Sequence, residues 1–134
     1  MSNFEKLLKE IRRDISGKSF EKFCKWFLEN DPYWKTQIDK IWMWDDWPER
    51  WDIDKGIDLV LKHKNGQNWA IQSKCYSEDY YIKKEDIDSF LSESNRIQIH
   101  KRLLVGTTDK LGRNARETMA GQEKPVVPIL LSDL

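Results

Sequence analysis

The sequence predicts an α/β fold with a central mixed β-sheet flanked by α-helices. Helical patterns precede a pair of apolar strands joined at Asn65-Gly66, and helices then alternate with short strands. The chain has 134 residues, of which 34% are charged and 12% are aromatic. A chain of this length and composition is typical of one globular domain, so we expect a single domain over 1–134.

Two helices are expected before the strand pair. Asn3 is placed to cap a first helix of about ten residues, and Gly17 separates it from a second helix over 18–30, which ends at Asp31-Pro32. Both helices carry apolar residues at the spacing of a buried face: Phe4, Leu7, Leu8 and Ile11 in the first, and Phe20, Phe23, Cys24, Phe27 and Leu28 in the second. Glu21 lies at the edge of the second apolar face, where it can lean over the sheet.

The segment 33–51 combines tryptophans with acidic residues. It contains Trp34, Trp42, Trp44, Trp47 and Trp51. Such large aromatic side chains need burial or a partner. We expect packing against the neighbouring helix or another domain, because the adjacent charges are mostly acidic and would repel phosphate. Stacking on nucleic-acid bases is the alternative.

The register of the central hairpin follows from its apolar pattern. Strands are expected over 57–62 and 68–74. A two-residue Asn-Gly turn would mix polar and apolar side chains on each face, whereas a three-residue loop over 64–66, with Gly66 in the left-handed conformation, separates them. This second register gives two apolar pairs: Leu59 with Ile71, and Leu61 with Trp69.

The same register gathers three polar residues. Asp58 falls opposite Gln72, and Lys74 follows further along the same face. A carboxylate, an amide oxygen and an ammonium at one place can support metal-assisted cleavage of a phosphodiester. The alternative is an ordinary amphipathic hairpin whose solvent face carries these residues.

Helices and strands are expected to alternate after the hairpin. The pattern predicts a helix over 84–94, a buried strand over 102–107, a helix over 113–120 and a last strand over 126–131. Because an apolar strand stands near the end of the chain, we expect one domain of a longer protein. A complete small protein whose last strand is central in its sheet is the alternative.

Composition excludes several classes of protein. No stretch has membrane-spanning length and no signal peptide is visible, so a cytoplasmic location is expected. Cys24 and Cys75 lack the grouping of a zinc site, which favours reduced thiols. A formal net charge of zero and a pI near 6.7 argue against an autonomous, tight nucleic-acid binder. No nucleophile elbow or phosphate loop supports another hydrolase class.

Five short motifs follow one another along the chain: Gly-Lys-Ser-Phe-Glu at 17–21, Asp-Lys-Gly-Ile-Asp at 54–58, Ile-Gln-Ser-Lys-Cys-Tyr at 71–76, Val-Gly-Thr-Thr at 105–108 and Asn-Ala-Arg at 114–116. Together they resemble the Mrr-type branch of the PD-(D/E)xK restriction-endonuclease-like superfamily. The resemblance covers roughly residues 17 to 131. The tryptophan-rich segment and the last strand resemble the N-terminal nuclease domain of single-chain type ISP restriction-modification enzymes. That likeness implies covalently linked helicase, methyltransferase and target-recognition domains.

The resemblance implies a Mg²⁺-dependent DNA endonuclease domain that nicks double-stranded DNA, with Mn²⁺ as a substitute cation. Asp58 would be the main metal ligand, Gln72 and the Ser73 carbonyl would add neutral oxygens, and Glu21 would supply a second carboxylate. Lys74 would orient the attacking water and stabilise charge on the phosphate.

Four basic residues are candidate DNA contacts: Lys83, Lys84, Arg113 and Arg116. A solvated surface is the alternative for each of them, because most lysines and arginines of any protein lie there. Two other functions remain open. One is a structure-selective nuclease, such as a junction resolvase, and the other is a DNA-binding or docking module that does not cut.

Overall fold

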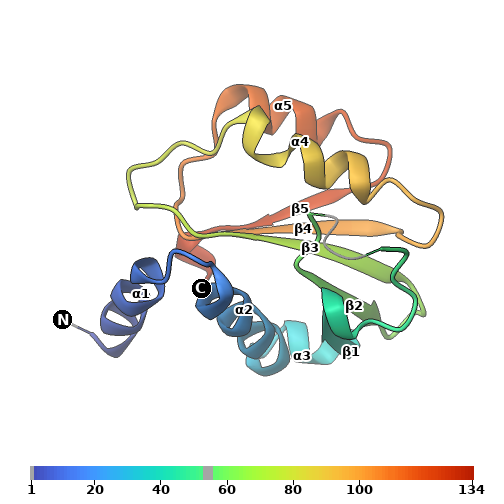
Figure 1. The fold of residues 1–134 in the computed structure, drawn as a ribbon, viewed down its shortest axis with the longest axis horizontal. Coiled ribbons are helices and arrows are strands. Elements are labelled where there is room, and N and C mark those ends of the chain that lie inside the picture. The colour runs from blue at the N-terminus through green and yellow to red at the C-terminus, as the bar shows by residue number, and fades with distance from the viewer. Residues whose placement is uncertain (1, 53–55) are drawn as a thin grey trace.

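A five-stranded mixed sheet lies between two layers of helices in the computed structural model, which describes residues 2–52 and 56–134 (Figure 1). The strands are β1 (Ile38–Met43), β2 (Leu59–His63), β3 (Asn68–Lys74), β4 (Lys101–Gly106) and β5 (Val126–Ile129). They lie in the sheet in sequence order. The pairs β1–β2 and β2–β3 are antiparallel, and the pairs β3–β4 and β4–β5 are parallel. The predicted fold class is confirmed.

One face of the sheet is covered by α1 (Asn3–Arg13) and α2 (Lys18–Asn30), with the short α3 (Trp34–Gln37) after them (Figure 1). The apolar face predicted for the second helix packs here. The core on this side joins helix residues to alternate strand residues: Ile11, Phe20, Cys24, Phe27 and Leu28 with Leu59, Leu61, Trp69, Ile71, Leu103, Val105 and Ile129.

The other face is covered by α4 (Lys84–Glu93) and α5 (Arg113–Ala120) (Figure 1). Its core contains Val60, Ala70 and Leu104 from the strands, Ile87 and Phe90 from α4, and Ala115 from α5. Both faces of the hairpin are therefore buried over most of their length. Near the carboxyl end of β3, Ser73 and Lys74 are partly exposed.

The register predicted for the hairpin is confirmed. Leu59 pairs with Ile71 and Leu61 with Trp69, and all four side chains are buried. The His63 N–H donates to the Gln67 carbonyl, which closes a loop of three residues, and Gly66 has φ 91°. Only glycine adopts this left-handed conformation at low cost.

Two details of the N-terminal half differ from the expectation. The structure has a further strand, β1, inside the tryptophan-rich segment, where none is predicted. It is an edge strand with exposed Asp39 and Lys40, so its apolar alternation is weak. The cap of α1 is Ser2 rather than Asn3, and the Ser2 side chain accepts a hydrogen bond from the Glu5 N–H.

The central tryptophans are buried as expected, but they pack on the α4 side of the sheet and not against the neighbouring helix α2 or another domain. Trp44, in the 3₁₀ turn η1 (Trp44–Asp46), and Trp47 are buried against the α4 side of the sheet. Their ring centroids lie 5.7 Å apart, and that of Trp51 lies 5.0 Å from Trp44. These rings belong to the core of this domain.

Parallel strands bring several segment ends together at one end of the sheet. The chain leaves the carboxyl ends of β3 and β4 there, and the loops lead to the first turns of α4 and α5 (Figure 1). Arg12 of α1 fixes this end, because its Nε donates to the Tyr76 carbonyl at 3.0 Å and its Nη2 to the Thr107 carbonyl at 2.7 Å. Among the described residues, none of the helices is long and apolar enough to cross a bilayer.

Candidate functional site

A cleft of about 620 Å³ lies between the start of α2, the η1 turn and the segment that enters β2. Its polar lining comprises Ser16, Lys18, Glu21, Asp45, Asp46 and Asp58. Four of these are acidic. The structure therefore brings Glu21 and Asp58, predicted from separate parts of the chain, to one cavity.

Asp58 reaches this cleft through an irregularity at the start of β2. Leu59 is the partner of Ile71 in the ladder, yet the Asp58 N–H also donates to the Ile71 carbonyl, at 2.9 Å. Two consecutive residues thus share one partner, which is the arrangement of a β-bulge. Bulges re-aim side chains and interrupt the alternation of faces.

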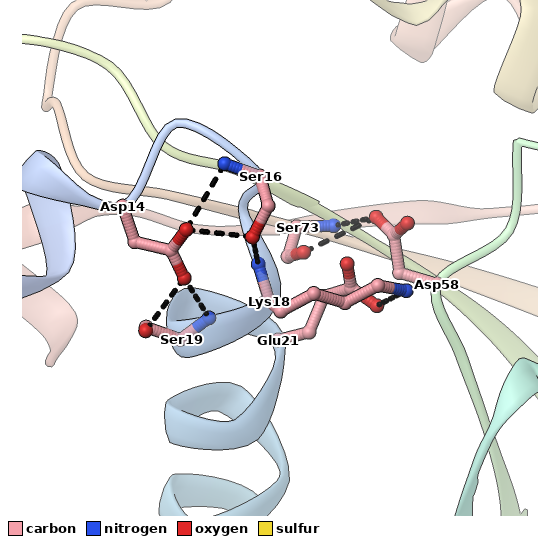
Figure 2. A network of polar contacts seen from close by, with 7 residues as sticks. All are labelled: Asp14, Ser16, Lys18, Ser19, Glu21, Asp58 and Ser73. Carbon is pink, nitrogen blue, oxygen red and sulfur yellow. Dashed lines mark hydrogen bonds and ion pairs between the residues drawn. The ribbon is translucent and has the colours of Figure 1, made fainter.

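The Asp58 carboxylate lies against Ser73 rather than against Gln72. Its Oδ2 accepts hydrogen bonds from the Ser73 N–H at 2.8 Å and from the Ser73 hydroxyl at 3.1 Å (Figure 2). Side chains alternate along a strand, so Ser73 points away from the face of Gln72 and Lys74. The expectation that Asp58 shares that face is wrong, and the bulge is the reason.

Glu21 projects from the first turns of α2 toward the same region (Figure 2). Its side chain is only 12% exposed and forms an ion pair with Lys18 at 3.6 Å. Burial raises the pKa of Glu21, and the nearby charge of Asp58 raises it further, while Lys18 opposes both effects. Burial also raises the pKa of Asp58, against the lowering effect of the Ser73 hydrogen bonds and of Lys74 and Lys18. A cation beside these two carboxylates would relieve the cost of keeping both ionised.

Gln72 is almost completely buried, at 6% exposure. Its Nε2 donates to the Gly56 carbonyl at 3.3 Å, and its Oε1 has no hydrogen-bond partner among the described residues. An unpaired buried oxygen is costly and is kept where something else satisfies it. The motif expected over 54–58 is described only at Gly56, Ile57 and Asp58, because Asp54 and Lys55 lie outside the described residues.

Lys74 lies half-buried at the carboxyl end of β3, next to Gly106 of β4. Its backbone is held by the Thr107 N–H, which donates to the Lys74 carbonyl at 3.2 Å. Its charge is close enough to lower the pKa of Asp58, although burial and Ser73 have larger effects on that group. No hydrogen bond of its ammonium to another described residue is formed, so the donors remain open to a ligand.

The candidate DNA contacts lie at the same end of the sheet, on α4 and α5. Lys84 pairs with Asp88 at 2.9 Å and Arg113 with Glu117 at 3.0 Å, each one turn along its own helix. The other two are exposed: the Lys83 ammonium lies 5.8 Å from the Tyr80 ring centroid, and Arg116 donates to the Leu111 carbonyl at 3.4 Å. The four do not join the acidic cleft, and their role in DNA binding stays a prediction.

Asp14 is a residue of this region that the sequence did not single out. The cap of α2 is Gly17, which has no side chain to offer, and Asp14 supplies the missing acceptor. Its Oδ1 accepts from the Ser16 N–H and hydroxyl, and its Oδ2 from those of Ser19 (Figure 2). An aspartate followed by serines two and five residues later, around a glycine, is the signal that would have revealed it. The network fixes the start of α2 and hence Lys18 and Glu21.

Replacing Asp14 by alanine is expected to lower the melting temperature at neutral pH by a few degrees. These hydrogen bonds hold the pKa of Asp14 far below the ordinary value of an aspartate, 3.8. A depressed pKa contributes stability above the unfolded-state value that is lost as the pH falls toward the folded-state value. The difference between the two proteins should therefore shrink below about pH 4. Thermal denaturation followed by circular dichroism measures it, with the exposed Glu10→Ala on α1 as the control. A difference that stays constant down to about pH 3 would contradict this account.

The oxygen donors present fit a hard divalent cation better than a soft one. Within residues 2–52 and 56–134, no three His, Cys, Asp or Glu side chains form a metal-binding group. The carboxylates of Asp58 and Glu21 are the predicted donors that line the cleft. The Gln72 oxygen, which has no partner among the described residues, lies on the opposite face of β3 from Ser73. Gln72 and the Ser73 carbonyl stay predicted donors. Carboxylate, carbonyl and amide oxygens are ligands that Mg²⁺ and Mn²⁺ accept.

The chain is similar to known proteins over most of its length. A family model described as a restriction endonuclease, Mrr_cat_2, matches residues 29–134. Among solved structures, the chain is similar to an ATP-dependent type ISP restriction-modification enzyme, LlaBIII, bound to DNA, with 34% identity and a TM-score of 0.85 over 99% of this chain. A search of curated proteins gave no match.

Two further structures share the fold. The DNA modification-dependent restriction endonuclease AspBHI has 18% identity and a TM-score of 0.68 over 96% of this chain. The MspJI restriction endonuclease, in complex with a 27-mer oligonucleotide, has 17% identity and a TM-score of 0.58 over 94%. The chain spans 8% of the LlaBIII chain, 33% of the AspBHI chain and 29% of the MspJI chain. It thus corresponds to one part of much longer proteins.

Proposed function

Because this chain belongs to the restriction endonuclease family, we propose that it is a divalent-metal-dependent domain that hydrolyses phosphodiester bonds of double-stranded DNA, one strand at a time. One observation carries the proposal: Glu21 and Asp58 line one acidic cleft, and the Asp58 carboxylate is held by Ser73. The charge of Lys74 reaches the same carboxylate. Hydrolysis of a phosphodiester needs a cation site and a positive group for the developing charge, and this end of the sheet offers both.

Each residue has a distinct proposed role. Asp58 and Glu21 would hold the cation. The Ser73 carbonyl is a predicted neutral donor, and Gln72 would contribute its oxygen only by reaching around from the opposite face of β3. When bound, Mg²⁺ supplies positive charge for the phosphate oxygens and the attacking water. Lys74 donates hydrogen bonds to that water and to a non-bridging phosphate oxygen. The water oxygen then forms a bond to phosphorus as the bond to the leaving sugar oxygen breaks. The proton of the attacking water passes to solvent, and the leaving oxygen takes up a proton from solvent to give a hydroxyl.

We further propose that the domain acts within a larger restriction-modification enzyme. The chain has a formal net charge of zero and so offers little general attraction to DNA. Other domains would then supply affinity and site recognition. The small share of the type ISP enzyme that this chain spans supports this proposal. Linked helicase, methyltransferase and target-recognition domains stay a prediction.

The isolated chain is expected to bind DNA weakly and to nick it, because one cleft attacks one strand at a time. The purified chain is incubated with supercoiled plasmid and Mg²⁺ at low salt, and the products are followed over time. Nicked circles should accumulate before any linear DNA, and chelation of Mg²⁺ with EDTA should stop the reaction. Linear DNA formed directly at nanomolar protein, without a nicked precursor, would contradict the one-strand mechanism.

A further inference from the structure

Lys18 stands at the mouth of the acidic cleft, directly above a carboxylate assigned to the metal. Its ammonium lies 3.6 Å from Glu21 Oε1, and its side chain is 63% exposed whereas that of Glu21 is 12% exposed. Figure 2 shows the Lys18 side chain lying along Glu21, on the side that faces Asp58. The lysine therefore covers the inner carboxylate from the solvent side.

Lys18 is a positive charge in an otherwise acidic cleft. Among the described residues that line the cleft, Lys18 is the one cation, against Glu21, Asp45, Asp46 and Asp58. An acidic cavity repels the phosphates of DNA unless cations neutralise it. A lysine at the first residue of a helix is also unfavourable for the helix itself, since the amino-terminal end of the helix dipole is positive. The stability of α2 thus does not explain why a lysine stands here.

We propose that Lys18 is a mobile counter-ion that neutralises Glu21 while no divalent cation is bound, and that it contacts a DNA phosphate beside the cleft once a cation takes its place. This inference rests on the proposed nuclease function. It gives Lys18 a role that no motif predicts, and it links metal loading to DNA binding through one side chain.

The exchange has little to oppose it. Glu21 is largely buried, but the lysine of the pair is 63% exposed, and its stem is flexible with three rotatable donors. A divalent cation on Glu21 neutralises that carboxylate and repels the ammonium, which then turns outward. The Lys18 ammonium then no longer competes with the divalent cation for Glu21. It can instead contact a DNA phosphate at the rim of the cleft.

The test compares Lys18→Gln with Lys18→Arg, which keeps the charge, and with Lys22→Gln as the matched control. Lys22 is an exposed residue of the same helix that lines the groove on the α1 side instead of the acidic cleft. Mn²⁺ affinity of each full chain is measured by isothermal titration calorimetry without DNA. Affinity for a fluorescent duplex is measured by anisotropy over a range of salt concentrations, with Ca²⁺ in place of Mg²⁺.

Lys18→Gln should bind Mn²⁺ about two- to fivefold more tightly than the unmodified chain, because the competing cation is gone. Its DNA affinity should fall, and the slope of log affinity against log salt should decrease by about 1. Lys18→Arg and Lys22→Gln should match the unmodified chain. Unchanged or weaker Mn²⁺ binding by Lys18→Gln, or an unchanged salt slope, would overturn the inference.

Failure of this inference and failure of the proposed function are separable. Asp58→Asn is titrated with Mn²⁺ in parallel. If Asp58→Asn binds Mn²⁺ like the unmodified chain, the assignment of the metal site itself is wrong. If Asp58→Asn loses Mn²⁺ binding while Lys18→Gln is unchanged, only the role of Lys18 is wrong.

Discussion

Replacing Asp58 by asparagine is expected to lower the rate of DNA cleavage at least about 100-fold without destabilising the domain. The loss of activity follows from removing the main negative charge at the proposed metal site. Stability should be kept or improved, because asparagine retains an oxygen acceptor for the Ser73 N–H and hydroxyl and removes a buried charge.

The effect of pH on this stability difference has a definite sign. Burial, the largest influence, raises the pKa of Asp58 above the ordinary value of an aspartate, 3.8, so the metal-free domain is destabilised by the ionised carboxylate at neutral pH. That penalty disappears as the pH falls through the raised pKa. The advantage of Asp58→Asn should therefore be present at neutral pH and shrink in acid. Added Mg²⁺ should raise the melting temperature of the unmodified chain and leave that of Asp58→Asn unchanged.

Single-turnover cleavage and thermal denaturation measure the two halves of this prediction. Asp39→Asn is the matched control, since it makes the same chemical change at an exposed position of β1. Cleavage by Asp58→Asn at nearly the unmodified rate would remove Asp58 from the active site. A variant that fails to fold would show that Asp58 is primarily a structural anchor for Ser73.

The sequence was sufficient to predict the fold and the register because buried faces leave a strong pattern. A shift of one residue in the hairpin would turn Leu59 and Ile71 to the opposite face of the sheet, away from the side chains of α2 that they pack against. Similarly, Gly17 and Asp31-Pro32 mark the limits of α2, whose observed bounds are the predicted ones.

The fine geometry of the site escaped sequence analysis because it depends on irregular backbone. A bulge at Asp58 does not disturb the apolar alternation around it, so the register of the hairpin predicts the wrong face for this residue. The cap of α2 comes from Asp14 across a turn rather than from the residue before the helix. Strand β1 alternates too weakly to be recognised. The bulge and the cap each depend on a hydrogen bond between residues whose separation in the sequence follows neither the helix period nor the strand period.

Replacing Lys74 by methionine is the second change with a large expected effect. The rate of cleavage should fall at least about 100-fold, because the ammonium is the proposed donor to the attacking water and the phosphate. The fold should persist, since β3 is held at this point by the Thr107 N–H on the Lys74 carbonyl, which the substitution leaves in place. Methionine also keeps the length of the apolar stem.

Single-turnover rates at saturating DNA separate loss of chemistry from loss of binding. Lys62→Met, at an exposed position of β2, controls for the removal of one positive charge from the sheet. Lys74→Arg should recover little activity, because a planar guanidinium does not reproduce a compact point charge. If Lys74→Met cleaves DNA at nearly the unmodified rate, its ammonium takes no part in the chemistry. Lys18, the cation among the described residues that line the cleft, would then be the remaining candidate to stabilise the phosphate. In that case Lys18→Gln should lower the cleavage rate at least about 100-fold, as expected here for Lys74→Met.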